Sequence, residues 1–162
     1  MNQLAYAALI VLRHKNGTPE LLMARRAEEK YMGGTWQLIS GRIETGEAAW
    51  QAALRELREE TSLAAVELYR LTSVDTFYRS DVDSLAFAVP FCALVSNEAT
   101  VRLNAENTAF AWFGLPEAAT KLMWPCDRRW LDEVIGEILC DGMSKPYLRI
   151  ALPPSEPAGQ CK

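Results

Sequence analysis

The segment 41–63 constrains this chain more than any other part of the sequence. It contains Glu56, Glu59 and Glu60, which are spaced i, i+3 and i+4. On a helix this spacing brings three carboxylates to one face, within about 6 Å of one another. Three negative charges this close repel each other unless a cation lies among them, and carboxylate oxygens are ligands that Mg²⁺ and Mn²⁺ prefer. The spacing therefore predicts a helix that carries a divalent metal site.

Arg55 directly precedes the first of these carboxylates. On the same helix it can reach Glu59 at i+4, and it can reach back to Glu47, so we expect it to orient the metal ligands. The alternative is a solvated helix face held by ion pairs, which the short charged run fits equally well. The longer pattern of glycine, glutamate and arginine positions over 41–63 favours the metal site, because chance would produce it in a chain of this length roughly once in 10⁵–10⁶.

This pattern resembles the signature of the Nudix hydrolase family: Gly, five residues, Glu, seven residues, Arg-Glu-apolar, one residue, Glu-Glu, one residue, Gly and an apolar residue. Ser62 stands where the signature has its second Gly. That Gly lets a chain leave a helix in a left-handed conformation. Serine at this position costs about 1 kcal/mol of strain, or imposes a different helix end, but it removes no ligand.

The resemblance implies a fold and a set of site residues. The fold is an α+β chain arranged as an α/β/α sandwich, with a mixed central sheet and the signature as loop-helix-loop. The implied metal ligands, for Mg²⁺ or Mn²⁺, are Glu56, Glu59, Glu60 and the carbonyl of Ser40. The implied structural positions of the signature are Gly41 and Glu47.

A later segment, Glu-Asn-Thr-Ala-Phe-Ala-Trp at 106–112, looks like the family's Glu-His-x-x-x-x-Trp, with Asn107 in place of the His. The resemblance makes Glu106 a candidate further metal ligand or general base. The alternative is an ordinary solvated loop glutamate. The candidate catalytic residues are therefore Glu59, Glu106 and Arg55.

Four other residues are candidate contacts for a phosphorylated substrate. Arg25 or Arg26 ends a strand as in the family, and Arg42 follows the first glycine of the signature, so each could bind a phosphate. Asp127 could hydrogen-bond a base edge, with Trp112 or Trp124 stacking on the base. For the arginines a surface cation is the alternative, and for the tryptophans the alternative is core packing.

Two further stretches resemble the bacterial dihydroneopterin triphosphate and dATP pyrophosphohydrolase branch: Trp-Gln-Leu-Ile-Ser-Gly-Arg-Ile-Glu at 36–44 and Trp-Pro-Cys-Asp-Arg at 124–128. We therefore expect hydrolysis of a (deoxy)nucleoside or pteridine triphosphate to a monophosphate and pyrophosphate. A second possibility is hydrolysis of ADP-ribose, a nucleotide sugar or a dinucleoside polyphosphate. A third is a nucleotide sensor without catalysis, although such proteins usually lose signature carboxylates.

Composition limits the other function classes. The chain of 162 residues has 17 basic and 21 acidic residues and a net charge of −4, which disfavours binding to duplex nucleic acid. No apolar run approaches the roughly 20 residues that span a membrane, and the early apolar run lacks the features of a signal peptide. The one histidine and four cysteines of the chain provide few zinc ligands. Scattered cysteines suit a reducing compartment, so we expect a soluble cytoplasmic protein.

One domain over 1–150, followed by a loose proline-rich tail over 151–162, fits the length; the oligomeric state stays open. The expected strands lie at 5–12, 21–24, 36–39 and 110–113 and within 66–95, and the expected helices at 47–61, 116–121 and 127–140. Asn16-Gly17 predicts a hairpin, and the segments 25–34 and 41–46 are expected to be loops. Pro90 predicts an edge strand or a bulge, and Asp127 a helix cap.

Overall fold

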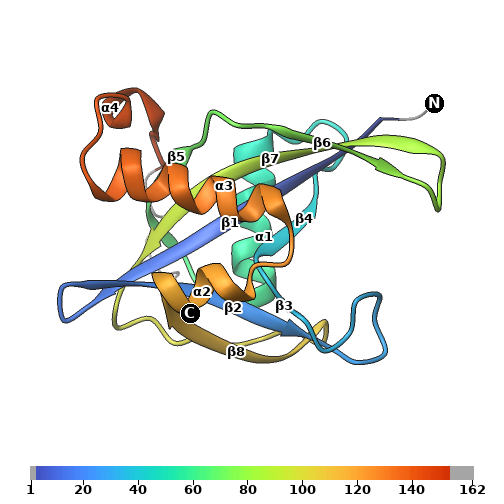
Figure 1. Cartoon of the computed structure of the whole chain (residues 1–162), viewed down its shortest axis with the longest axis horizontal. Coiled ribbons are helices and arrows are strands. Elements are labelled where there is room, and N and C mark those ends of the chain that lie inside the picture. Colours follow the sequence, from blue (N-terminus) through green and yellow to red (C-terminus); the bar gives the residue numbers. More distant parts are fainter. Residues whose placement is uncertain (1–2, 154–162) are drawn as a thin grey trace, which may run out of the picture.

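The computed structural model describes residues 3–153, and within them nine strands form one mixed sheet (Figure 1). The long strand β1 (Gln3–Lys15) is central. It pairs antiparallel with β2 (Thr18–Arg26) and β4 (Ile39–Arg42), and parallel with β7 (Ser84–Val95). The parallel pair among antiparallel neighbours confirms the mixed sheet expected from the sequence.

The shorter strands extend this sheet on both sides. Strands β3 (Trp36–Gln37) and β8 (Asn107–Gly114) pair antiparallel with β2. Strands β5 (Ala65–Arg70) and β6 (Asp75–Arg79) pair antiparallel with β7, and β9 (Arg149–Ile150) with β5. Most of the expected strands are present and are longer than the apolar runs that predicted them. The single strand expected at 36–39 is wrong, because β3 and β4 divide it at Leu38 and pair with different strands.

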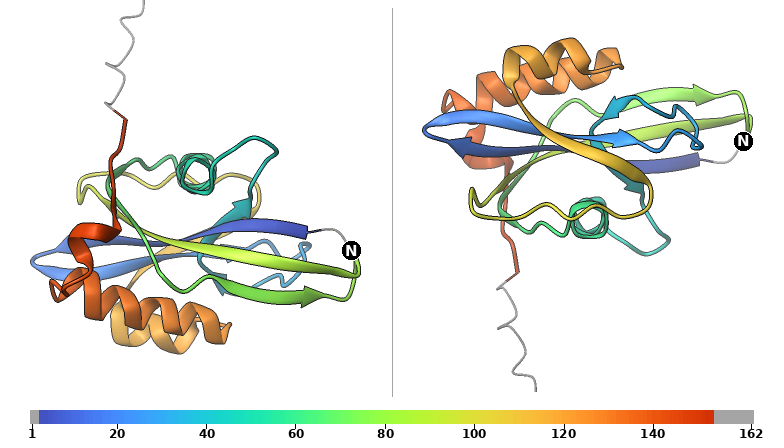
Figure 2. Two further views of the ribbon diagram at one scale, coloured as in Figure 1. Left: turned by 90° about the horizontal axis from the view of Figure 1, so that it is seen from above. Right: turned by 90° about the horizontal axis from the view of Figure 1, so that it is seen from below.

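Helices cover both faces of the sheet (Figure 2). Helix α1 (Ala49–Thr61) lies on one face, where Leu57 packs against alternate residues of β1 such as Leu9. Helices α2 (Leu115–Lys121) and α3 (Pro125–Glu133) and the π-helix η1 (Val134–Leu139) lie on the other face. Because side chains alternate along a strand, β1 contributes to both cores. The layers confirm the predicted α/β/α sandwich.

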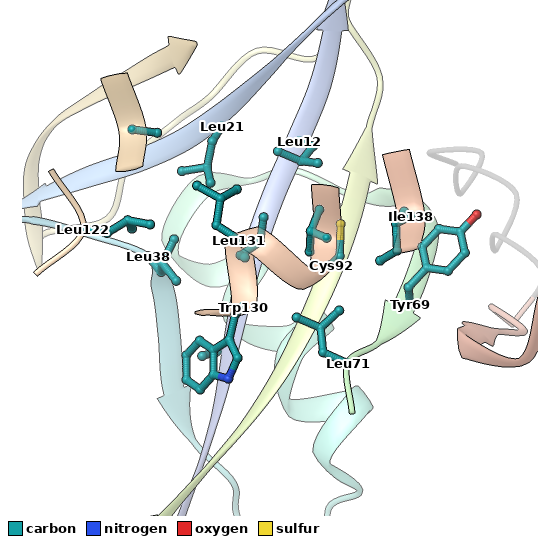
Figure 3. Close-up of a cluster of buried hydrophobic side chains, with 14 of the residues drawn as sticks. Leu12, Leu21, Leu38, Tyr69, Leu71, Cys92, Leu122, Trp130, Leu131 and Ile138 are labelled. Atoms are coloured by element: carbon teal, nitrogen blue, oxygen red, sulfur yellow. The ribbon is translucent and has the colours of Figure 1, made fainter. Parts of the chain in front are cut away.

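The core under α3 is built from the helix stripe that the sequence predicts (Figure 3). Trp130 and Ile138 are buried with Leu12 and Cys92 of the sheet. Trp130 also donates a hydrogen bond from its indole nitrogen to the carbonyl of Ser73, 2.7 Å away. A short helix, α4 (Lys145–Leu148), precedes β9. None of the helices between residues 3 and 153 is both long and apolar enough to cross a bilayer.

The turn between β1 and β2 forms as predicted, since Asn16 and Gly17 both have positive φ, at 52° and 78°. The expected loop boundaries on either side of this region are wrong. Strand β2 continues to Arg26, and β4 includes Gly41 and Arg42, so two segments expected as loops begin inside strands. Backbone pairing of β2 with β8, and of β4 with β1, keeps each strand extended beyond its apolar residues.

The prediction that Pro90 marks an edge strand or a bulge is also wrong, because β7 has neighbours on both sides. Pairing with β6 ends at Ala88, and pairing with β5 begins at Phe91. Pro90 lies between these two partners, where its carbonyl accepts a hydrogen bond from the Leu71 backbone N–H at 3.1 Å. A missing N–H is tolerated at this position because the neighbouring strand changes there.

Two predicted helix starts need correction. Helix α1 begins at Ala49, so Glu47 lies in the preceding turn instead of the first helical turn. Helix α3 begins at Pro125 after Trp124, so Asp127 lies inside the first turn and is not the cap. Proline is favoured at this first helical position because the missing N–H would have no partner there. Of the predicted tail, residues 154–162 lie outside the described residues.

Candidate active site

Gly41 lies in β4 directly against the carboxylate of Glu56. A Cβ built on Gly41 would lie 1.9 Å from Cδ and from Oε1 of Glu56, so any other residue would displace the carboxylate. The glycine lets α1 bring Glu56 against the backbone of β4, next to Ser40. Only 14% of the Glu56 side chain is exposed. The first glycine of the signature therefore serves a close approach between helix and strand.

Arg55 holds the acidic side chains at the start of the site. Its Nε and Nη2 donate to the two carboxylate oxygens of Glu47 at 2.9 and 3.0 Å, and Nη2 also donates to the carbonyl of Arg42 at 2.9 Å. Its Nη1 donates to Glu56 at 2.6 Å and to Glu59 at 3.3 Å. The predicted contacts from Arg55 to Glu47 and Glu59 are therefore present, with Glu56 as a further partner.

The pKa values of the two glutamates bonded most closely to Arg55 are shifted in opposite directions. Hydrogen bonds from Arg55 and from the Glu44 N–H lower the pKa of Glu47. Burial raises the pKa of Glu56, although Arg55 opposes this change. The negative charges of Glu59 and Glu106 add to the increase. Glu56 is thus a carboxylate whose negative charge one arginine only partly compensates.

Glu60 has no cationic partner among residues 3–153. It is 7% exposed, its Oε1 accepts a hydrogen bond from the backbone N–H of Ser40 at 3.3 Å, and its Oε2 accepts one from Nδ2 of Asn107 at 2.9 Å. Burial raises the pKa of Glu60 to about 7, and the two neutral donors only partly oppose this increase. The charges of Glu56 and Glu106 raise it further.

The remaining acidic candidates lie at the edge of this group. Glu59 is exposed over 56% of its side chain, where it meets Arg55. Glu106 is exposed in the loop before β8, and the pKa increases of Glu56 and Glu60 show that its charge is near both. Helix α1 and this loop therefore bring together Glu56, Glu60 and Glu106, with Glu59 on the solvent side.

A preformed cluster of three converging acidic, Cys or His side chains is not found among residues 3–153. Glu56 is turned to Arg55, and Glu60 to Ser40 and Asn107. The residues nevertheless fit a hard divalent cation: the donors are carboxylates and backbone carbonyls, Gly41 leaves room for Glu56, and burial leaves negative charge uncompensated.

The end of α1 shows how the chain accommodates the serine of the signature. Ser62 adopts the left-handed conformation, with φ 60° and ψ 14°, and its N–H donates to the Arg58 carbonyl at 2.8 Å. The helix end that glycine normally permits therefore forms with serine. It leaves the positions of Glu59 and Glu60 on the helix unchanged.

The arginine candidates at the end of β2 face opposite sides of the sheet. Arg25 donates to the carbonyl of Gly34 at 3.1 Å and to Glu28 at 3.2 Å. Alternation along β2 places Arg26 on the face that packs against α1, opposite Asn107 of β8. The Nε of Arg26 is buried and lacks a hydrogen-bond partner within the described structure. The side chain of Arg42 is exposed at the end of β4.

Asp127 lies on the other face of the sheet from α1, in the first turn of α3. It is 8% exposed, and burial raises its pKa to about 6 despite hydrogen bonds from the Trp124 backbone and from Cys126. Trp124, directly before the helix, is about half exposed, whereas Trp112 lies under the guanidinium of Arg13. The structure therefore does not bring Asp127 to the carboxylates of α1.

Sequence reasoning gave no role to Asn107, which the structure places against Glu60. The available signal was its position directly after Glu106. The contact depends on the position of β8 beside β2 and on the loop before β8, and the spacing of residues in the sequence does not predict either.

A model of the NUDIX domain matches residues 3–134. Among curated proteins, an octanoyltransferase of Myxococcus xanthus is 37% identical over 71% of this chain and 32% of its own length. A pig bis(5'-nucleosyl)-tetraphosphatase is 33% identical over 51% of this chain and 58% of its length. The dihydroneopterin triphosphate diphosphatase of Escherichia coli is 26% identical over 69% of this chain and 80% of its length.

Similar solved structures agree with the fold. An Ap4A hydrolase of Caenorhabditis elegans, in a binary complex, has a TM-score of 0.68 and 22% identity, covering 82% of this chain and 95% of that one. The chain spans about a third of the first curated relative.

Proposed function

This chain belongs to the NUDIX domain family, and on that basis we propose that it is a Mg²⁺-dependent pyrophosphohydrolase. The proposed reaction converts a (deoxy)nucleoside or pteridine triphosphate to a monophosphate and pyrophosphate. The observation that carries the proposal is the buried carboxylate of Glu60, which among residues 3–153 is bonded only by neutral donors. It lies on the same helix as Glu56, which packs against Gly41. A divalent cation would stabilise the negative charge of such a group, and Mg²⁺ bound together with a polyphosphate would be that cation.

The proposed reaction adds one water across a phosphoanhydride. The water oxygen forms a bond to one phosphorus and gives a proton to the general base, the bond from that phosphorus to the bridging oxygen breaks, and the leaving pyrophosphate takes up the electron pair. Bound Mg²⁺ would supply charge neutralisation and Lewis acidity to this step. We propose Glu56, Glu59, Glu60 and the Ser40 carbonyl as its ligands.

Glu106 is the proposed further ligand or general base for the attacking water. Its carboxylate is exposed and its charge is felt by both Glu56 and Glu60, so it lies at the accessible side of the same group. Glu59 shares this accessible side. Arg55, fully used in bonds to Glu47, Glu56 and the Arg42 carbonyl, is proposed to orient the ligands.

The proposed phosphate contact is Arg26. Its buried Nε lacks a partner, and its side chain lies on the α1 face opposite Asn107, which itself bonds Glu60. Arg25 is a weaker candidate for this contact, because it already bonds Gly34 and Glu28 on the other face of the sheet. Arg42 stays a candidate at the exposed end of β4. A guanidinium is well suited to bind phosphate oxygens.

Asp127 is proposed to contact the base or pteridine, with the exposed ring of Trp124 beside it. A carboxyl group with a pKa of about 6 can change protonation near neutral pH, and so can either accept or donate a hydrogen bond. The similarity to the dihydroneopterin triphosphate diphosphatase, which covers 80% of that protein, supports this branch. We further propose that 1–150 acts as one domain, in the cytoplasm.

A second candidate is a dinucleoside polyphosphate hydrolase. The identity of 33% to the bis(5'-nucleosyl)-tetraphosphatase favours it. This candidate would use the same carboxylates and would differ only in what lies beyond the phosphates.

Product formation with excess Mg²⁺ tests the proposal on a panel of dNTPs, 8-oxo-dGTP, dihydroneopterin triphosphate, ADP-ribose and a diadenosine polyphosphate. The Glu56→Gln variant, purified in parallel, controls for contaminating phosphatases. Pyrophosphate released from a triphosphate supports the proposal and names the substrate. Turnover of the dinucleotide alone supports the second candidate. Nucleotide binding that persists in EDTA without turnover would overturn both in favour of a sensor.

A further inference from the structure

We propose that Asn107 is a positioning residue, whose side-chain amide fixes the orientation in which the Glu60 carboxylate meets a divalent cation. This inference rests on the proposed function, since it concerns the same group of carboxylates. It goes beyond that function because Asn107 touches neither water nor phosphate in the proposed reaction and acts through Glu60 alone.

The first support is the geometry around Glu60. Nδ2 of Asn107 lies 2.9 Å from Oε2, and the Ser40 backbone N–H lies 3.3 Å from Oε1. Each carboxylate oxygen can accept about two hydrogen bonds or metal contacts. One donor on each oxygen therefore fixes the plane of the carboxylate and leaves each oxygen one free position.

The second support is charge. At Glu47, Glu56 and Glu59 the group that holds the carboxylate is the guanidinium of Arg55, which also compensates negative charge. The amide of Asn107 is neutral, and the carboxylate of Glu60 to which it donates is only 7% exposed. A neutral donor thus orients Glu60 without competing electrostatically with a bound cation. A basic side chain in its place would compete.

The third support is that Asn107 itself is firmly held. In the loop before β8, the N–H of Arg102 donates to the Thr61 carbonyl at 2.8 Å, and the N–H of Asn104 to the Glu60 carbonyl at 3.4 Å. On the other side, the Ala27 N–H donates to the Glu106 carbonyl at 3.0 Å. These bonds tie the loop to the end of α1 and to β2. The Asn107 amide is therefore placed before any ligand binds.

The test is Mn²⁺ binding to the full chain without substrate, measured by isothermal titration calorimetry and by electron paramagnetic resonance. Asn107→Leu keeps the side-chain shape but removes the donor. We expect its Kd for Mn²⁺ to rise by about 10–100-fold, as is usual when a residue that hydrogen-bonds a metal ligand is lost. Asn107→Ala serves as a second variant if the leucine destabilises the fold, with melting temperature recorded for both.

Two further variants separate positioning from simple structural support. Asn107→Gln keeps a neutral amide donor, and we expect a Kd within about threefold of wild type. Thr108→Ala is the matched control, because Thr108 is the adjacent, exposed residue, and it too should stay within threefold. A folded Asn107→Leu variant with wild-type Mn²⁺ affinity would overturn the role of Asn107 and leave the proposed function standing. A wild-type chain that binds no Mn²⁺ would overturn the proposed function.

Discussion

The turn before helix α1 and the last turn of the helix hold their carboxylates in opposite ways. Before the start of α1, Glu47 accepts a bidentate pair of hydrogen bonds from Arg55, and the pKa of Glu47 is lowered. Near the end of the helix, Glu60 is buried with two neutral donors, and its pKa is raised to about 7. The negative charge of Glu47 is therefore compensated by an arginine, whereas that of Glu60, in the same motif, is not.

The difference supports the proposed position of a cation on this motif. A carboxylate matched by a guanidinium gains little from a metal ion, whereas one taken out of water with only dipoles around it gains much. Glu56 is intermediate, because Arg55 bonds it and burial still raises its pKa. The metal site should therefore be centred on Glu56 and Glu60, with Arg55 and Glu47 as its support.

The largest expected effect comes from the uncompensated end. Glu60→Gln removes a negative charge that we place on the metal, so kcat should fall by at least ~10². Steady-state kinetics at saturating Mg²⁺ measures this change. Glu98→Gln, an exposed glutamate beyond the end of β7, is the matched control. Near-normal activity of Glu60→Gln would remove the distinction between Glu47 and Glu60.

At the compensated end, Arg55→Ala leaves Glu47, Glu56 and Glu59 without their shared partner. We expect a loss of about 10–100-fold in metal affinity, as for other residues that orient ligands. Arg55→Lys should recover little, because an ammonium group cannot reproduce the bidentate pair with Glu47. Mn²⁺ titration together with melting temperature checks both variants. Lower stability with unchanged metal affinity would make Arg55 purely structural.

A smaller effect distinguishes the two arginines of β2. Arg26→Ala should raise KM about tenfold, corresponding to loss of one charge-assisted hydrogen bond to phosphate. Arg25→Ala should change KM by less than about threefold, since this side chain already bonds Gly34 and Glu28. Initial-rate kinetics on the best substrate of the panel tests the pair. Equal changes in KM for both variants would contradict the assignment to Arg26.

The smallest effect concerns Asp127, a buried carboxylate on the opposite face of the sheet. Because folding raises its pKa from 3.8 to about 6, the folded state binds the proton more tightly. The contribution of Asp127 to stability therefore falls as pH rises from 3.8 to 6 and stays low above it. Asp127→Asn should then stabilise the chain by about 1 kcal/mol at pH 7.5 and by almost nothing at pH 4.

Urea unfolding at both pH values measures this difference. A variant that is less stable than wild type at pH 7.5 would show that the Asp127 charge is well compensated by its neighbours. A raised pKa would then not be enough to identify Glu60, at the end of α1, as an uncompensated carboxylate.

Much of the site was predictable because it is local in sequence. Helical spacing brings Glu56, Glu59 and Glu60 to one region of α1 and allows Arg55 to reach Glu59, whatever surrounds the helix. The hairpin at Asn16-Gly17 and the buried stripe of α3 follow from equally local rules. The wrong boundaries at β2, β4 and Pro90 have a common cause: hydrogen bonds from neighbouring strands decide where a strand ends.

The sequence by itself therefore determined the helix, its row of carboxylates and the guanidinium beside them, because these depend on periodicity and short-range contact. The layered fold was implied by the resemblance of the signature and not by periodicity. Only the tertiary structure decided that Gly41 lies against Glu56, that Asn107 bonds Glu60, and that Arg26 and Arg25 face opposite sides of the sheet. Burial sets which carboxylate keeps an uncompensated charge, and burial exists only once β4, β8 and α1 have packed together.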